Sequence, residues 1–238
     1  MHQFALSAFD SSRIKALTLD LDDTLWPIGP TIARAEQVLA DWLAQQAPAT
    51  AALYADRTLL RVMREQVEHE RPDLAHDLGA LRRESIRSLL LRAGDDSALA
   101  EQAFEVFFQE RQRVELFADA LPMLERLAAR FPLVALSNGN ADIHRVGIGT
   151  YFTAAISAHA YGVAKPDPRI FHAAATAAGV SPGEVLHVGD DAYLDGVGAL
   201  NAGMQLAWVN RHGYSWDHAP LQPHITLPDL RTLCDLLL

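Results

Sequence analysis

The chain has little of three things that mark whole classes of protein: cysteine, basic residues and long apolar runs. Its one cysteine among 238 residues, Cys234, cannot close an internal disulfide, which excludes a disulfide-framed secreted domain. Lys and Arg number 20 against 30 Asp and Glu, and the net charge of -10 disfavours DNA, RNA and anionic membranes as partners. No apolar run reaches the roughly 18 residues of a membrane span.

The beginning of the sequence also lacks the features of a secretory signal. Residues 1–10 have neither a basic start nor a long apolar stretch. We therefore expect a reducing, cytoplasmic location, with Cys234 as a buried structural thiol. The chain does have 50% hydrophobic residues, enough for one large α/β domain or for a core with a smaller insert.

An apolar, strand-like run near the start ends in carboxylates. Residues 16–19 predict a buried strand, and Asp20, Asp22 and Asp23 follow within four positions. Carboxylates this close repel one another and lose hydration at a strand end, which favours a compensating cation. Oxygen ligands suit Mg2+, and side chains two apart on an extended chain face the same side. The alternative is an ordinary acidic turn, with Asp23 or Thr24 capping the next element.

Helical periodicity fills the eighty-odd positions that follow. Apolar residues recur three and four apart in four stretches, which are residues 31–46, 51–67, 74–92 and 97–113. No strand-like run interrupts them. The pattern predicts about four helices packed as a separate small domain.

From Val114 onward, strand-like and helical segments alternate. The expected strands are residues 133–136, 154–156, 185–188 and 206–209, and the expected helices lie near 119–130, 168–179 and 192–202. Such alternation is typical of a parallel sheet covered on both faces. The first strand, residues 14–19, has no such partners nearby in sequence, so we expect it to join this later sheet. The helical domain is then an insertion into an α/β core.

Polar residues follow the expected strands at the end where open α/β sheets bind ligands. Taken singly, each stretch has an ordinary explanation as a turn, a surface lysine or a helix cap. Together they place hydroxyl, amide, ammonium and carboxylate groups at one edge of the sheet. These groups belong to Ser137, Asn138, Lys165, Asp190, Asp191 and Asp195.

Four short segments resemble, in order and spacing, those of the haloacid dehalogenase superfamily of hydrolases. They are Asp20-Leu21-Asp22-Asp23-Thr24, Ser137, Lys165-Pro166, and Gly189-Asp190-Asp191 with Asp195. The resemblance covers essentially the whole chain. It implies a Rossmann-like catalytic core at residues 1–27 and 114–238 and an all-helical cap at residues 28–113, of the kind found in the phosphatase subgroup.

The resemblance also implies a reaction, the Mg2+-dependent hydrolysis of small-molecule phosphate monoesters. Asp20 is the implied nucleophile, which forms an aspartyl-phosphate. Asp22 would protonate the leaving oxygen and later deprotonate the attacking water. Lys165 would supply positive charge to Asp20 and the phosphoryl oxygens, while Ser137 and Asn138 donate hydrogen bonds to the phosphate.

The implied metal ligands are the Asp20 carboxylate, the Asp22 backbone carbonyl and Asp190. Three further residues are candidates for supporting the site: Thr24, Asp191 and Asp195. Asp191 and Asp195 either bind the metal through water or orient Lys165, and the sequence does not rank these uses.

The residue Asp22 bears on the type of reaction. Dehalogenases of the superfamily lack an aspartate there, because displacing a halide needs no acid for the leaving group, so phosphoryl transfer is favoured. A phosphomutase acting on a sugar phosphate stays open, since it uses the same core and excludes water. A receiver-type signalling protein also combines acidic residues, Mg2+, a hydroxyl and a lysine, but its domain is much shorter and has no helical insert.

The substrate is less well specified than the reaction. Asn138-Gly139-Asn140 and residues 187–191 and 202–205 resemble bacterial family members assigned to flavin mononucleotide and to the phosphorylated ribitylaminouracil of riboflavin biosynthesis. Trp26 has two open uses, stacking on an aromatic substrate or hydrophobic packing. His187, within an expected strand, is predicted to be packed structure. The sequence gives no oligomeric state.

Overall fold

The computed structural model describes residues 9–238, so the expectation about a secretory signal at the start falls largely outside the described residues. The chain divides into two compact units. The sheet unit holds the described residues up to Pro27 together with Glu115–Gly139 and Ile143–Leu238, and the helical unit holds Ile28–Val114 and Asn140–Asp142. Residues 140–142, which the sequence analysis placed in the core, thus group with the helices.

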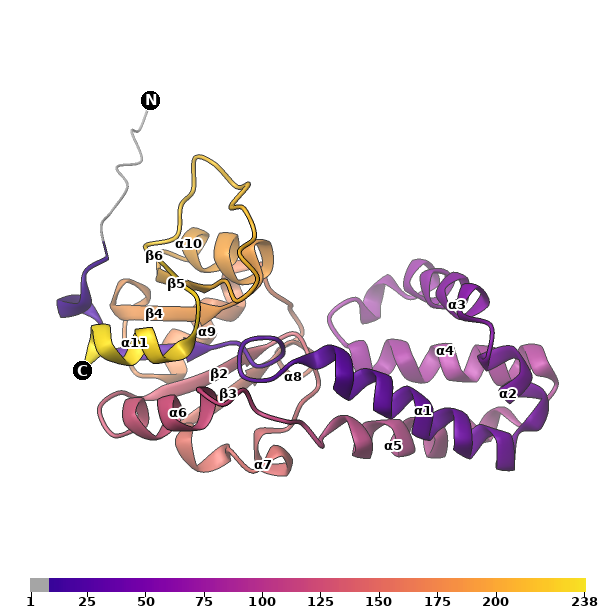
Figure 1. The fold of residues 1–238 in the computed structure, drawn as a ribbon. Coiled ribbons are helices and arrows are strands. Elements are labelled where there is room, and N and C mark those ends of the chain that lie inside the picture. The colour runs from indigo at the N-terminus through magenta and orange to yellow at the C-terminus, as the bar shows by residue number, and fades with distance from the viewer. Residues whose placement is uncertain (1–8) are drawn as a thin grey trace. The chain divides into compact units, whose positions relative to one another are not determined.

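Six parallel strands form the sheet unit, in the order β3-β2-β1-β4-β5-β6 (Figure 1). They are β1 (Ala16–Leu19), β2 (Leu133–Ser137), β3 (Ala154–Ser157), β4 (Val185–Gly189), β5 (Gln205–Val209) and β6 (Ile225–Leu227). The predicted α/β class is confirmed, and the first strand does join the later sheet. The strand β6 was not predicted, because three residues are too few to show a period.

The strand order reverses between β1 and β4. From β1 the chain passes outward through β2 to β3, and it then returns to the other side of β1 with β4. In open parallel sheets this reversal leaves a crevice at the carboxyl ends of the two strands. Every residue of β1 and β4 is buried, so their polar neighbours are held on rigid elements.

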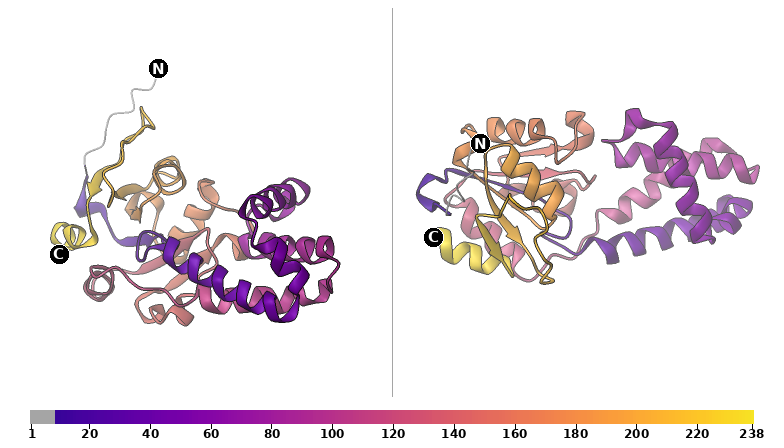
Figure 2. Two further views of the ribbon diagram at one scale, coloured as in Figure 1. Left: turned by 45° about the vertical axis from the view of Figure 1, so that its right-hand side comes forward. Right: turned by 90° about the horizontal axis from the view of Figure 1, so that it is seen from above.

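Helices cover both faces of this sheet (Figure 2). They are α6 (Ala120–Ala128), α7 (Ile143–Val146), α8 (Ala158–Tyr161), α9 (Pro168–Ala177), α10 (Gly198–Asn201) and α11 (Leu230–Leu237). Apolar residues of α9 and α10 pack on alternate residues of β2 and β5, while α6 and α11 pack together on the other face. Cys234 is buried in α11, as expected.

The helical unit contains five α-helices, each within the described residues. They are α1 (Ile28–Gln46), α2 (Pro48–Tyr54), α3 (Arg57–Glu70), α4 (Leu78–Ala93) and α5 (Ala100–Arg111). The prediction of one helix over residues 51–67 is wrong. The chain breaks before Arg57 because the Asp56 carboxylate accepts hydrogen bonds from the backbone N–H groups of Thr58 at 2.9 Å and Leu59 at 3.0 Å, which caps a new helix.

None of the helices within residues 9–238 combines the length and the apolar character needed to cross a bilayer. The cytoplasmic location stays a prediction.

Candidate active site

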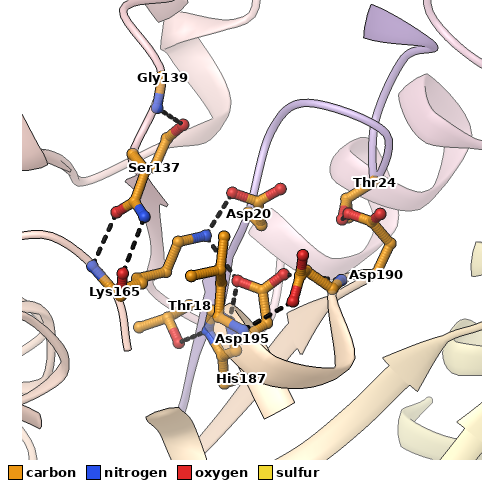
Figure 3. A network of polar contacts seen from close by, with 12 residues as sticks. Thr18, Asp20, Thr24, Ser137, Gly139, Lys165, His187, Asp190 and Asp195 are labelled. Atoms are coloured by element: carbon orange, nitrogen blue, oxygen red, sulfur yellow. Dashed lines mark hydrogen bonds and ion pairs between the residues drawn. The ribbon is translucent and has the colours of Figure 1, made fainter. Parts of the chain in front are cut away.

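Three of the predicted site residues, Asp20, Ser137 and Asp190, lie at the carboxyl ends of three adjacent strands (Figure 3). Asp20 follows β1, Ser137 is the last residue of β2, and Asp190 follows β4. The backbone N–H of Asp20 donates to the Val188 carbonyl at 2.9 Å, so the pairing of β1 with β4 extends to their carboxyl ends. Asp20 and Asp190 therefore stand on either side of the point where the strand order reverses.

A buried lysine joins two of the carboxylates. The Nζ of Lys165 donates to Oδ1 of Asp20 and to Oδ1 of Asp195, both at 2.5 Å. Burial by itself would lower the pKa of Lys165, but Asp195 and Asp20 outweigh it and raise the pKa above its usual range. Lys165 is thus a fixed positive charge directly at Asp20.

Three carboxylates meet beside this lysine. Asp20, Asp190 and Asp195 each offer an oxygen, and these oxygens lie within 4.8 Å of one another. Burial raises the pKa of Asp20 well above its ordinary value, and Asp195 and Asp190 add to the rise while Lys165 opposes it. Burial, helped by Asp195, also raises the pKa of Asp190 to about 7. The single ammonium of Lys165 thus does not offset the burial and mutual repulsion of these carboxylates, which leaves the cluster short of positive charge.

This shortage fits a divalent cation. The one ammonium bonds two of the three carboxylates, and the three carboxylates offer hard oxygens, which Mg2+ prefers. Asp20 and Asp190 are two of the three ligands that the sequence analysis named. The third was the backbone carbonyl of Asp22, and the Asp22 carboxylate does not belong to the described cluster.

A buried hydrogen-bonded chain fixes Asp195. His187 has no exposed surface, and its Nε2 lies 3.1 Å from Oδ1 of Asp195 while its Nδ1 lies 2.8 Å from Oγ1 of Thr18. Burial lowers the pKa of His187, and Lys165 and His187 together overcome the burial of Asp195 to lower its pKa. An ionised Asp195 only accepts, so Nε2 of a neutral His187 donates and Nδ1 accepts from Thr18.

Glycine is required behind the same carboxylate. A Cβ on Gly189 would lie 2.4 Å from Cγ of Asp195, a distance that no side chain tolerates. Asp195 sits on η6, a π-helical segment (Ala192–Val197), and its Oδ2 accepts from the backbone N–H of Asp191 at 3.1 Å. The absence of a side chain at residue 189 thus lets Asp195 reach Lys165.

Asp191 and Asp195, whose uses the sequence left open, make different contacts in the structure. Asp195 orients Lys165. The Asp191 carboxylate instead caps η6, accepting from the backbone N–H groups of Tyr193 at 2.8 Å and Leu194 at 2.7 Å. Thr24 supports the cluster directly, because its hydroxyl donates to Oδ1 of Asp190 at 2.9 Å.

Ser137, the last residue of β2, and Asn138, which follows it, make different contacts. The Ser137 hydroxyl oxygen accepts from the N–H of Gly139 at 2.9 Å, so its own proton points elsewhere. The Asn138 amide donates to the Lys165 carbonyl at 3.0 Å and accepts from the Lys165 N–H at 2.8 Å. Asn138 therefore fixes the backbone of Lys165, and phosphate binding by Ser137 and Asn138 stays a prediction.

The remaining predicted acid, Asp22, contacts a tryptophan. The indole N–H of Trp26 donates to Oδ1 of Asp22 at 2.8 Å. Trp26 has no exposed surface. Stacking of Trp26 on a substrate is therefore wrong, because the ring is packed inside the protein.

Comparison with known proteins agrees with this geometry. A family model described as haloacid dehalogenase-like hydrolase matches residues 14–203. The chain belongs to this hydrolase family. The membership inferred from the four segments is confirmed.

Relatives of this hydrolase carry different activities. The 5-amino-6-(5-phospho-D-ribitylamino)uracil phosphatase YigB of Escherichia coli (strain K12) is 35% identical over 94% of this chain and 97% of its own length. A phosphoserine phosphatase of Thermus thermophilus is 34% identical over 66% of each chain. The crystal structure of a 2-haloacid dehalogenase from Pseudomonas syringae pv. Tomato DC3000 is 40% identical in sequence, with a TM-score of 0.88, and the match covers 94% of this chain and 98% of that one.

Sequence reasoning missed the part that four residues play in the site of this hydrolase. Thr18 and His187 lie within strands, where they look like core positions. Trp26 and Trp208 look like packing residues, yet the indole N–H of Trp208 donates to the Asp190 carbonyl at 2.7 Å. Only for His187 was there a signal, a titratable ring in an otherwise apolar strand.

Proposed function

We propose that this hydrolase is a Mg2+-dependent phosphatase that cleaves small-molecule phosphate monoesters through an aspartyl-phosphate on Asp20. The observation that carries the proposal is the cluster of three carboxylates around one lysine at the switch point of the sheet. A phosphate monoester dianion repels an anionic nucleophile, so a phosphatase needs more positive charge than Lys165 alone supplies.

The metal would be held by Asp20, Asp190 and the backbone carbonyl of Asp22. When bound, Mg2+ reduces the repulsion between the nucleophile and the phosphoryl oxygens. Lys165 adds a second positive charge at Asp20, and Asp195 keeps that ammonium in place. Ser137 and Asn138 would donate hydrogen bonds to the same oxygens.

The chemistry takes two displacements at phosphorus. An oxygen of Asp20 forms a bond to phosphorus while the ester P–O bond breaks, and the leaving oxygen takes a proton from the Asp22 carboxyl to depart as an alcohol. Water then attacks the phosphorus of the aspartyl-phosphate and gives a proton to the Asp22 carboxylate. The bond between Asp20 and phosphorus breaks, which releases phosphate and restores both carboxyl groups to their starting states.

Dehalogenation is a second candidate because a 2-haloacid dehalogenase of known structure is 40% identical to this chain. Two features of this chain favour phosphoryl transfer instead. Halide displacement needs no proton donor, whereas Asp22 is present here and hydrogen-bonded. It also needs no compensating cation, whereas the carboxylates around Lys165 are in excess.

For the substrate, we propose a phosphate ester of a ribityl-linked ring, either flavin mononucleotide or ribitylaminouracil phosphate. The similarity to a ribitylaminouracil phosphate phosphatase over nearly the whole chain supports it. Since Trp26 is buried, another side chain has to contact the ring. His212 and Tyr214, the latter 68% exposed, line a cavity of about 190 Å³ beside Asp190 and are candidates.

A substrate panel tests this proposal. We would measure kcat/KM with Mg2+ for the two ribityl phosphates, for glucose, ribose and glycerol phosphates, and for 2-chloropropionate. We expect release of phosphate, loss of turnover in excess chelator, and preference for the ribityl esters. Chloride release from 2-chloropropionate would establish the dehalogenase instead, and conversion of a sugar phosphate to its isomer without free phosphate would establish a mutase. Preference for a small sugar phosphate would leave a general phosphatase.

A further inference from the structure

We infer that Trp208 is a positioning residue for the metal site, because its indole N–H holds the backbone of Asp190 in the orientation that brings the Asp190 carboxylate to Asp20. The inference rests on the proposed function, in which Asp190 is a metal ligand. It adds a residue that neither the four sequence segments nor the carboxylate cluster contains. It starts from one contact, the hydrogen bond of 2.7 Å from Nε1 of Trp208 to the backbone oxygen of Asp190.

The contact fixes one peptide unit from two sides. The carbonyl of Asp190 and the N–H of Asp191 belong to the same planar unit and point in opposite directions. Trp208 bonds the carbonyl, and Oδ2 of Asp195 accepts from the N–H at 3.1 Å. Because both ends are bonded to side chains, the plane cannot rotate without the loss of a hydrogen bond. Trp208 and Asp195 together therefore fix the turn that follows β4.

The carboxylate of Asp190 is held by a different residue. Its Oδ1 accepts from the Thr24 hydroxyl at 2.9 Å, and the carboxylate offers an oxygen within 4.8 Å of oxygens of Asp20 and Asp195. Thr24 thus holds the far end of this side chain, while Trp208 holds the backbone from which it starts. Groups that orient a ligand in this way contribute to the affinity of a site for its metal. A carboxylate fixed at both ends keeps its oxygens in position before the cation binds.

Trp208 is suited to this use because it is itself held in place. It lies in β5, is paired with Gly189 of β4 in the parallel ladder, and is 3% exposed. Its ring packs edge-on against the ring of Trp216, with 5.2 Å between the ring centroids. A buried N–H that loses its partner has no water to replace it, so the bond to Asp190 is costly to break. The indole is therefore a rigid donor.

The neighbouring Trp216 makes a similar bond outside the site. Its indole N–H donates to the Leu221 carbonyl, also at 2.7 Å, and Leu221 lies in the loop between β5 and β6. The two tryptophans therefore match in donor, in distance and in the kind of acceptor. They differ in one respect, since only the acceptor residue of Trp208 is a proposed metal ligand. Trp216 is thus a matched control.

Exchanging the N–H for sulfur isolates the contact. We would replace Trp208 by β-(3-benzothienyl)alanine, which has sulfur in place of the N–H, and make the same replacement at Trp216 as the control. Trp208→Phe is made in parallel, and thermal unfolding without Mg2+ checks that each protein is folded. The sulfur analogue keeps nearly the full shape of the side chain, so the test stands even where Trp208→Phe fails to fold.

The readout is the Kd of Mg2+, measured by isothermal titration calorimetry on the folded, metal-free proteins. Loss of a group that orients a metal ligand weakens metal binding about 10- to 100-fold, so the Trp208 analogue should raise Kd about tenfold or more. The Trp216 analogue should change Kd by less than about twofold. With 4-nitrophenyl phosphate, kcat at saturating Mg2+ should stay within about twofold of the wild type, because the contact acts on a ligand and not on the reacting atoms.

The outcomes separate the inference from the proposed function. A Trp208 analogue with a lower melting temperature but the Kd of the wild type would overturn the inference alone and leave Trp208 a packing role. An equal rise of Kd in the Trp216 analogue would overturn it too. A wild type that binds no Mg2+, or that hydrolyses phosphate esters at full rate in excess chelator, would overturn the proposed function and the inference with it.

Discussion

Each unit of the molecule contains a network of charged side chains, partly buried in the helical unit and almost fully buried around Lys165 in the sheet unit, and the two networks differ in their balance of charge. In the helical unit, Glu36 accepts from Arg64 and from Arg82, both at 2.7 Å, and from the Tyr54 hydroxyl. Burial by itself would raise the pKa of Glu36, but Arg82, Tyr54 and Arg64 outweigh it and lower the pKa to about 2. The negative charge of Glu36 is thus compensated by two arginines of the same unit.

In the sheet unit the balance is reversed. Lys165 bonds Asp20 and Asp195, and Asp190 lies beside them with its pKa raised to about 7. The comparison teaches that buried charge by itself does not mark a functional site. The ion pairs of Glu36, which are balanced within the protein, join helices α1, α3 and α4. The excess of carboxylates beside Lys165 instead favours the binding of a cation, which can in turn hold a phosphate.

Neutralising one carboxylate in the unbalanced network gives the largest expected effect. Asp20→Asn should lower kcat/KM with 4-nitrophenyl phosphate by about a thousandfold or more, since the nucleophile is gone. The free energy of unfolding should stay the same or rise, because one of three repelling groups is removed. Steady-state kinetics and urea unfolding measure both. Asp41→Asn, the same change at an exposed site on α1, should alter neither; a destabilised Asp20→Asn would mean that the cluster is structural.

The same chemical change in the balanced network should have the opposite pattern. Glu36→Gln leaves two arginines without their carboxylate, and we expect a loss of about 2 kcal/mol in the free energy of unfolding, or about 5 °C in Tm. Turnover per folded molecule should stay within about twofold. The exposed Glu68→Gln on α3 serves as the control. A large loss of activity with unchanged stability would erase the distinction between the two units.

A smaller effect follows from pH. In the metal-free protein, folded Asp190 keeps its proton up to about pH 7, while the unfolded chain loses it near its ordinary pKa of 3.8. The folded state binds more protons in this interval, so the free energy of unfolding should fall as pH rises, by about 1 kcal/mol between pH 6 and 7. Glu36 acts in the opposite sense, since its stabilisation is lost as pH falls through 4.5 toward about 2.

Magnesium should reverse the trend caused by Asp190. Deprotonated carboxylates bind the cation, so the rise in Tm on adding Mg2+ should grow from pH 5 to 8. Differential scanning fluorimetry at several pH values measures this. Asp190→Asn should flatten both dependences, and a Mg2+ effect independent of pH and of Asp190 would show that the cation binds elsewhere.

Much of the sheet unit could be predicted from the sequence, because its strands and helices have clear hydrophobic patterns and its polar residues stand directly after the strands. Buried parallel strands are continuous apolar runs, and the polar residues that follow them share one edge by topology. The joining of residues 14–19 to strands more than a hundred positions later was predicted from the absence of nearer partners. The break at Asp56 was not, because a capping aspartate within a long amphipathic stretch looks like any other exposed residue.

The supporting contacts of the site could not be predicted. The hydrogen bonds of Trp26 and His187 depend on which side chains the fold brings within about 3 Å, and sequence spacing does not encode this. Asn138 illustrates the same limit. Its predicted phosphate contact was inferred from a strand end, while its contacts in the structure fix the Lys165 backbone.

Trapping the covalent intermediate tests the central claim most directly. The Asp22→Asn variant would be mixed with Mg2+ and 4-nitrophenyl phosphate, quenched within the first turnover, and digested for peptide mass spectrometry. We predict one phosphoryl group on Asp20, formed with a burst of 4-nitrophenol and slowly hydrolysed, because the amide that replaces the Asp22 carboxylate cannot take the proton of the attacking water. A burst with the phosphoryl group on another residue, or turnover with no covalent phosphate at all, would contradict the claim that Asp20 is the nucleophile of this enzyme.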